Sequence, residues 1–128
     1  MIKLTFCLAR RPEMPREAFQ DYWRTHHAPK VMAAKEALGI KRYVQCHSYA
    51  MPMAEAAAEA RGIAIGDNVH DFDGVAELWW ESRETFEAAL ATEEGQRHGK
   101  ILAEDEATFI DFSRSRFFMV EENVVIGD

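Results

Sequence analysis

Cysteines, basic residues and long apolar runs are scarce in this chain of 128 residues, and each shortage excludes a class of protein. The two cysteines, Cys7 and Cys46, form no C-x-x-C pair, so we expect neither a redox motif nor a zinc site. A formal net charge of −7 disfavours nucleic acid and anionic membranes as partners, because no basic stripe offsets the repulsion from phosphate groups. The N-terminal apolar stretch reaches Arg10 and Arg11 after a few residues, which predicts neither a signal peptide nor a membrane span. We therefore expect a cytoplasmic protein without a nucleic-acid or membrane partner.

Sequence motifs for cofactors and metals are absent as well. Neither G-x-G-x-x-G nor G-x-x-x-x-G-K occurs, so a nucleotide or flavin cofactor is not expected. His26 and His27 are adjacent, and neighbouring residues on a helix point about 100° apart, which prevents the two from binding one metal ion together. No H-x-x-x-H spacing provides a second ligand. We expect no cofactor and no metal.

Chain length and a hydrophobic fraction of 48% predict a single globular domain over residues 1–128. The alternation of apolar residues, their helical spacing and the turn residues divide the domain into six main elements. These are a strand at 2–9, a helix at 15–38, a strand at 40–49, a strand at 72–80, an irregular helix at 82–112 and a strand at 116–125. Their order predicts an α+β fold of the ferredoxin-like split βαβ type (βαββαβ), with both helices on one face of a four-stranded antiparallel sheet.

Residues 51–71 form an insertion between two strands that a short hairpin could join. Its alanine-rich part predicts a short helix that ends at a glycine. We expect the insertion to cover a cleft or the edge of a dimer as a lid, with Met51, Met53, Ile63 and Ile65 as its inward contacts.

Large apolar side chains are expected on both faces of the predicted sheet. Trp79 beside Trp80, and Phe117 beside Phe118, must point to opposite faces, because successive residues of a strand alternate. The two helices cover only one face, and the other would be an exposed apolar patch in a monomer. We therefore expect a homodimer that forms through the sheet face.

The segment from Phe19 to Val31 is the strongest candidate for a site, because it concentrates aromatic residues and histidines. Phe19, Trp23 and His27 share one helical face, and Tyr22 lies on its flank. Pro29 predicts a kink or break of the helix just after the histidines. The same spacing is also typical of ordinary core residues, so a core role and a ligand-binding role both remain open.

Glu77 is the second candidate, since it lies in mid-strand on the same face as Trp79. Apolar neighbours would raise its pKa toward a range that suits an acid or base. The alternative is a cross-strand ion pair, for example with Lys3. His47 lies on one face of the strand at 40–49, which lines a cleft in one interpretation and is a solvated edge in the other.

Three segments together resemble the EthD-like proteins of the dimeric α+β barrel superfamily. They are Phe19-x-x-Tyr22-Trp23-x-x-x-His27-x-Pro29-x-Val31, the strand Phe72-Asp73-Gly74-Val75-Ala76-Glu77-Leu78-Trp79-Trp80, and Asp105-x-x-x-Phe109-Ile110-Asp111. The resemblance implies a ferredoxin-like protomer whose sheet packs on the sheet of a second copy. The family takes its name from a protein linked to bacterial ether degradation by a cytochrome P450 system. The wider superfamily includes isomerases, polyketide cyclases, cofactor-free monooxygenases and haem-degrading enzymes.

The first functional hypothesis is a small dimeric protein that binds an apolar or aromatic metabolite and catalyses cofactor-free proton transfer, as an isomerase or cyclase does. His27 is the expected general base, and Glu77 its orienting partner or the acid. The expected ligand-binding residues are Phe19, Tyr22, Trp23, His47 and Trp79.

Two alternatives come from the resemblance. One is a non-catalytic accessory or ligand-binding component of an oxidative system of the ether-degradation type. The other is haem binding through His26 or His27.

Overall fold

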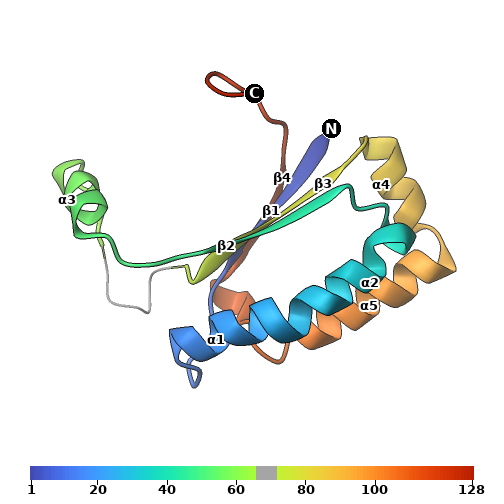
Figure 1. Ribbon diagram of the computed structural model, residues 1–128, viewed down its shortest axis with the longest axis horizontal. Helices are drawn as coiled ribbons and strands as arrows, with labels where there is room; N and C mark the ends of the chain where they lie inside the picture. Colours follow the sequence, from blue (N-terminus) through green and yellow to red (C-terminus); the bar gives the residue numbers. More distant parts are fainter. Residues whose placement is uncertain (66–71) are drawn as a thin grey trace.

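Four strands form an antiparallel sheet in the computed structural model, which describes residues 1–65 and 72–128. The strands are β1 (Ile2–Leu8), β2 (Arg42–His47), β3 (Gly74–Trp80) and β4 (Arg116–Val120). Their order across the sheet is β2-β3-β1-β4, with all neighbours antiparallel, and the helices α1, α2, α4 and α5 lie on one face (Figure 1). This is the ferredoxin-like arrangement predicted from the sequence.

The first helical segment runs from Arg16 to Leu38 but changes its hydrogen-bond pattern on the way. It consists of α1 (Arg16–Tyr22), a π-helical turn η1 (Trp23–His27) and α2 (Ala28–Leu38). Pro29 was predicted to kink or break the helix after the histidines, yet the helix continues through it. The wider turn just before the proline gives its ring room beside the preceding carbonyl groups. The irregularity therefore includes both histidines, rather than following them.

The second helical segment is divided into α4 (Arg83–Leu90) and α5 (Glu93–Glu106), followed by a short 3-10 helix η2 (Phe112–Arg114). The hydroxyl of Thr92 caps α5 by accepting a hydrogen bond from the backbone N–H of Gly95. A side chain at Gly95 would lie 1.9 Å from the carbonyl oxygen of Ala89, so glycine permits the close approach of the two helices. Within residues 1–65 and 72–128, no helix is long and apolar enough to span a membrane.

The insertion carries α3 (Pro52–Ala60), which projects away from the sheet and the other helices (Figure 1). Met51, Met53 and Ile63 are all exposed, and Met53 retains 85% of its accessible surface. Their exposure contradicts the predicted role as inward contacts within one protomer. The alternative, that the insertion covers the edge of a dimer, stays a prediction. Residues 66–71 of the insertion lie outside the described residues.

The core lies between the helices and the inner face of the sheet and has two clusters. The first is centred on Leu4, Val31, Ala34, Leu38, Ile40, Trp80 and Leu102, and the second on Leu8, Phe19, Trp23, Ala76, Phe109 and Ile110. Both clusters join the first helical segment to the sheet, which fixes the position of the π-turn relative to β1 and β3.

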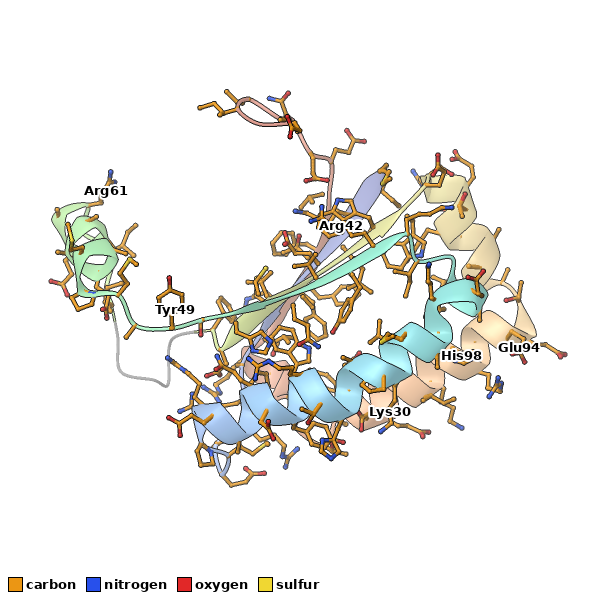
Figure 2. The ribbon with its side chains drawn as sticks, in the orientation of Figure 1. Lys30, Arg42, Tyr49, Arg61, Glu94 and His98 are labelled. Carbon is orange, nitrogen blue, oxygen red and sulfur yellow. The ribbon has the colours of Figure 1, made fainter. Side chains whose placement is uncertain are left out.

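The outer face of the sheet is less apolar than predicted. Trp79 lies there with the Lys3 ammonium 5.0 Å and the Arg42 guanidinium 4.6 Å from its ring, and Arg42 points away from the helices (Figure 2). Lys3 also forms an ion pair of 2.7 Å with Glu77. The segment after β4 contributes Glu122, which accepts a hydrogen bond from the indole N–H of Trp79. Charged side chains thus surround the tryptophan on this face.

Candidate functional site

A cavity of about 270 Å³ lies between the inner face of the sheet and the helices. Most of its lining is apolar: Leu4, Phe6, Leu8, Ala76, Leu78 and Trp80 come from the sheet, and Trp23, Val31, Leu38, Phe86, Leu102 and Ile110 come from the helical side. Among the described lining residues, His27, Tyr43 and Glu106 carry titratable groups. An apolar cavity with a few polar groups is typical of a small-molecule site.

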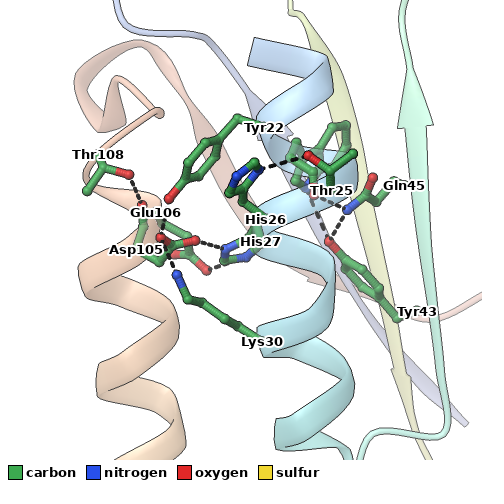
Figure 3. Close-up of polar contacts among 11 residues, drawn as sticks. Tyr22, Thr25, His26, His27, Lys30, Tyr43, Gln45, Asp105, Glu106 and Thr108 are labelled. Atoms are coloured by element: carbon green, nitrogen blue, oxygen red, sulfur yellow. Dashed lines mark hydrogen bonds and ion pairs between the residues drawn. The ribbon is translucent and has the colours of Figure 1, made fainter. Parts of the chain in front are cut away.

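His27 is held in place by a carboxylate from the neighbouring helix. Its side chain comes from the π-turn and is only 5% exposed, and its Nδ1 lies 2.7 Å from Oδ2 of Asp105 in α5 (Figure 3). The other oxygen of Asp105 accepts hydrogen bonds from the Tyr22 hydroxyl at 2.6 Å and from the Lys30 ammonium at 2.9 Å. Three elements thus converge on one carboxylate, which fixes the orientation of the imidazole ring.

The charge states of the pair follow from these contacts. Burial lowers the pKa of His27 and outweighs the opposing effect of Asp105, so the imidazole is neutral near neutral pH. Burial alone would raise the pKa of Asp105, but hydrogen bonds from Tyr22, Lys30 and His27 together hold it below its ordinary value. The neutral ring therefore donates its Nδ1 proton to the carboxylate, and Nε2 keeps a lone pair.

Glu106 is the second acidic group at the cavity. Its Oε2 lies 3.7 Å from Nε2 of His27, beyond direct hydrogen-bond distance, and its side chain is 22% exposed. Burial, with a smaller contribution from the negative charge of Asp105, raises the pKa of Glu106 to about 7. Neutral imidazole and a carboxyl group that titrates near neutral pH thus face the same apolar space.

Trp23 forms the wall of the cavity next to His27, and polar groups fix its position. Its indole N–H donates to the Tyr43 hydroxyl at 3.2 Å, and its backbone carbonyl accepts from the Gln45 amide at 2.9 Å. The ring of His47 packs on Trp23 with ring centres 4.6 Å apart. Phe19 is fully buried beside Trp23 and supports it from behind.

Glu77 does not meet His27. In β3, Ala76 and Leu78 line the cavity, and because side chains alternate, Glu77 and Trp79 point to the opposite face of the sheet. The predicted pairing of Glu77 with His27 is therefore wrong, and Trp79 does not line the cavity that contains His27. The hydrogen bond from Lys3 lowers the pKa of Glu77, which is the reverse of the predicted rise and agrees with the alternative of a cross-strand ion pair.

Sequence reasoning gave no role to Asp105 or Glu106, although Asp105 stands in one of the quoted motifs. The sequence does contain a pattern that indicates a role for Asp105, because Leu102, Asp105 and Phe109 share one helical face. An acidic residue within an apolar stripe needs a buried partner. Among the residues that the structure describes, no group of three or more His, Cys, Asp or Glu residues is arranged to hold a metal ion.

Comparisons with known proteins give one family and a set of similar folds. The EthD domain family matches residues 11–113, and no curated protein matches. Among solved structures, an ethyl tert-butyl ether D (EthD) family protein from Bacillus halodurans C-125 is 23% identical with a TM-score of 0.60, covering 96% of this chain and 99% of the other. An EthD-like protein from Ralstonia eutropha JMP134 is 17% identical with a TM-score of 0.56, covering 98% and 94%. SnoaB from Streptomyces nogalater, a cofactor-independent oxygenase, is 12% identical with a TM-score of 0.56, covering 99% and 97%.

Proposed function

We propose a function for this chain, which belongs to the EthD family. It binds a small apolar or aromatic metabolite in the cavity between the sheet and the helices, and acts on it by proton transfer without a cofactor. One observation carries the proposal: His27 lines the apolar cavity, and Asp105 lies 2.7 Å from its Nδ1, which leaves Nε2 of the neutral ring with the lone pair. A neutral, oriented imidazole beside a bound molecule is a general base.

His27 removes a proton from the bound molecule through Nε2 and becomes a cation. Asp105, 2.7 Å from Nδ1, stabilises this cation and keeps the ring in position, so it acts as a positioning residue. Lys30 and Tyr22 keep Asp105 ionised through their hydrogen bonds. Trp23 forms the aromatic side of the site, and His47 and Phe19 pack against it without lining the cavity. Isomerisation and cyclisation are the reactions that such a base supports.

We further propose that two copies associate through the outer face of the sheet. Phe118 points to this face and is 47% exposed, and the C-terminal segment exposes Val124, Val125 and Ile126. Burying these apolar side chains against a second copy would remove them from water. A dimer mass by analytical ultracentrifugation is the expected result, and a monomer at micromolar concentration would contradict it.

The catalytic proposal can be tested with 2-tetralone, an apolar ketone whose α-hydrogens exchange with solvent when a base removes them. Proton NMR in D₂O follows the loss of the α-hydrogen signal. We expect the wild-type protein to accelerate exchange and His27→Gln to lower the rate about a hundredfold. His26→Gln is the matched control, because His26 is exposed and lies outside the cavity. Binding of 2-tetralone without any accelerated exchange would contradict catalysis and favour a non-catalytic binding or accessory role.

A further inference from the structure

Glu106 stands where two hollows of the protein meet. The inner cavity and an outer hollow of about 280 Å³ share three lining residues, Phe6, Glu106 and Phe117. Phe112 also lines the outer hollow, and both Phe112 and Phe117 are at least half exposed. Glu106 therefore lines both the cavity next to His27 and the outer hollow.

We propose that Glu106 is a second catalytic residue, which together with His27 interconverts the keto and enol forms of an uncharged cyclic ketone or phenol. The inference rests on the proposed function, in which His27 is the base, and adds to it the second group and the class of substrate. Its geometric basis is the distance of 3.7 Å between Nε2 of His27 and Oε2 of Glu106. The two atoms are too far apart to form a hydrogen bond with each other, but close enough to contact neighbouring atoms of one bound molecule.

The protons balance within this pair. Nε2 of His27 accepts the hydrogen on the carbon next to the carbonyl group, and the electrons of that C–H bond form the C=C bond of the enol. The carbonyl oxygen takes the proton of the Glu106 carboxyl group, which leaves an imidazolium and a carboxylate. Transfer of the imidazolium proton to the carboxylate restores both groups, so that the product differs from the substrate only in the position of one hydrogen.

The charges around Glu106 suit this role. Among the residues that the structure describes, Asp105 on the same helix, His27 from η1 and Tyr43 from β2 are the titratable groups that act on it or respond to it. The nearby cation Lys30 is hydrogen-bonded to Asp105. Because burial and Asp105 raise the pKa of Glu106 to about 7, its carboxyl group exists in both protonation states near neutral pH. A group that gives and regains a proton in each cycle needs both states.

The same charges define the class of molecule that fits. The apolar walls favour one or two rings in a volume of about 270 Å³, which is slightly below the usual range for ligand sites. Asp105 behind His27, and Glu106 whenever it is ionised, place negative charge at the polar end of the cavity, so an anionic ligand would be repelled there. An uncharged ketone or phenol meets no such repulsion and offers an oxygen to Glu106.

The test uses deuterium exchange into 2-tetralone, with Glu106→Gln and Glu106→Asp as variants. We expect Glu106→Gln to exchange about a hundredfold more slowly than the wild type, and Glu106→Asp to recover part of the rate. Glu104→Gln is the matched control, since it removes the same charge from an exposed position on α5. The wild-type rate should fall as pH rises above about 7, where Glu106 loses its proton, and this decline should be missing in Glu106→Gln.

The outcomes separate this inference from the proposed function. If Glu106→Gln keeps the wild-type rate and pH profile while His27→Gln is inactive, the role of Glu106 is overturned and the role of His27 stands. If the wild-type protein does not accelerate exchange at all, both fail. NMR titration of the His27 ring in the free protein adds a check that needs no ligand. Its signal should shift as Glu106 ionises near pH 7, and the absence of that shift in the wild type would contradict the coupling of the two groups.

Discussion

Glu77 in β3 and Glu106 in α5 lie next to aromatic side chains on opposite sides of one sheet. Their pKa values are shifted in opposite directions. The hydrogen bond from Lys3 lowers the pKa of Glu77, whereas burial and the charge of Asp105 raise that of Glu106 to about 7. Their side chains are similarly exposed, 24% and 22%. Burial alone therefore does not decide which carboxylate can exchange protons near neutral pH. At Glu77 the hydrogen bond from Lys3 outweighs the effect of burial, whereas at Glu106 burial is the larger cause of the raised pKa and the charge of Asp105 adds to it.

Trp23 and Trp79 lie on the same two sides of the sheet as Glu106 and Glu77, and substituting them gives the largest expected effect. Trp23 is 1% exposed and closely packed in the core, whereas Trp79 lies among charged side chains on the outer face. We expect Trp23→Ala to lower the free energy of unfolding by about 4 kcal/mol, and Trp79→Ala by about half as much in the isolated protomer. Urea denaturation at low protein concentration measures both. Equal losses would show that the outer face is packed as firmly as the core.

The effect of Glu106→Gln on the free energy of unfolding should depend on pH. The folded pKa of Glu106 is raised from 4.5 to about 7, so between these values the folded state holds a proton that the unfolded state has lost. The stability of the wild type therefore decreases as pH rises through this window. Glutamine cannot ionise, so above pH 7 the variant should be more stable than the wild type by about 3 kcal/mol, with no difference below pH 4.5.

Thermal or urea unfolding across this pH range measures the effect, and Glu104→Gln again controls for the loss of one surface charge. His27 changes in the opposite direction, because its lowered pKa makes stability rise with pH below 6.5. Because His27 contributes to the pH dependence of every variant, Glu106→Gln and Glu104→Gln are each compared with the wild type at the same pH. A Glu106→Gln variant that is less stable than the wild type above pH 7 would contradict the assigned shift.

The corresponding change on the outer face should have the reverse sign. Glu77→Gln removes a carboxylate that Lys3 stabilises at 2.7 Å, so we expect a loss of about 1 kcal/mol near neutral pH. Since the folded pKa of Glu77 is lowered, the loss should disappear as pH falls through the acidic range in which the carboxylate is protonated. A double-mutant cycle with Lys3→Met isolates the pair. A coupling energy of zero would mean that the ion pair contributes nothing.

The fold could be predicted from the sequence because it follows from local patterns. Alternation in β1 and the glycine that ends α2, which adopts a positive φ of 71°, both depend on neighbouring residues alone. The site could be predicted only in part. His27 was found because it shares a helical face with Trp23, but its partner depends on how α5 packs beside η1, two elements far apart in the chain.

The error over Glu77 has a related cause. Alternation shows that Glu77 and Trp79 share a face, but not which face of the sheet the helices cover. Trp79 and Trp80 are adjacent and both buried, so apolar character did not distinguish the two faces. The sequence-based hypothesis therefore paired His27 with a glutamate from the wrong side.

The smallest predicted effect concerns Arg42, whose guanidinium lies 4.6 Å from the centre of the Trp79 ring. Arg42 also lowers the pKa of Glu77 through its charge, although less than Lys3 does. Arg42→Met keeps an unbranched side chain and removes the charge, so it should cost about 0.5 kcal/mol of stability and raise the pKa of Glu77 slightly. NMR titration of the Glu77 carboxyl carbon measures the second effect, and the titration of Glu106 in the same spectra is the internal control. Because the sheet separates the two faces, Glu106 should titrate as in the wild type. A shift of both groups would mean that the two faces are electrostatically coupled, and their separate behaviour would then need another cause.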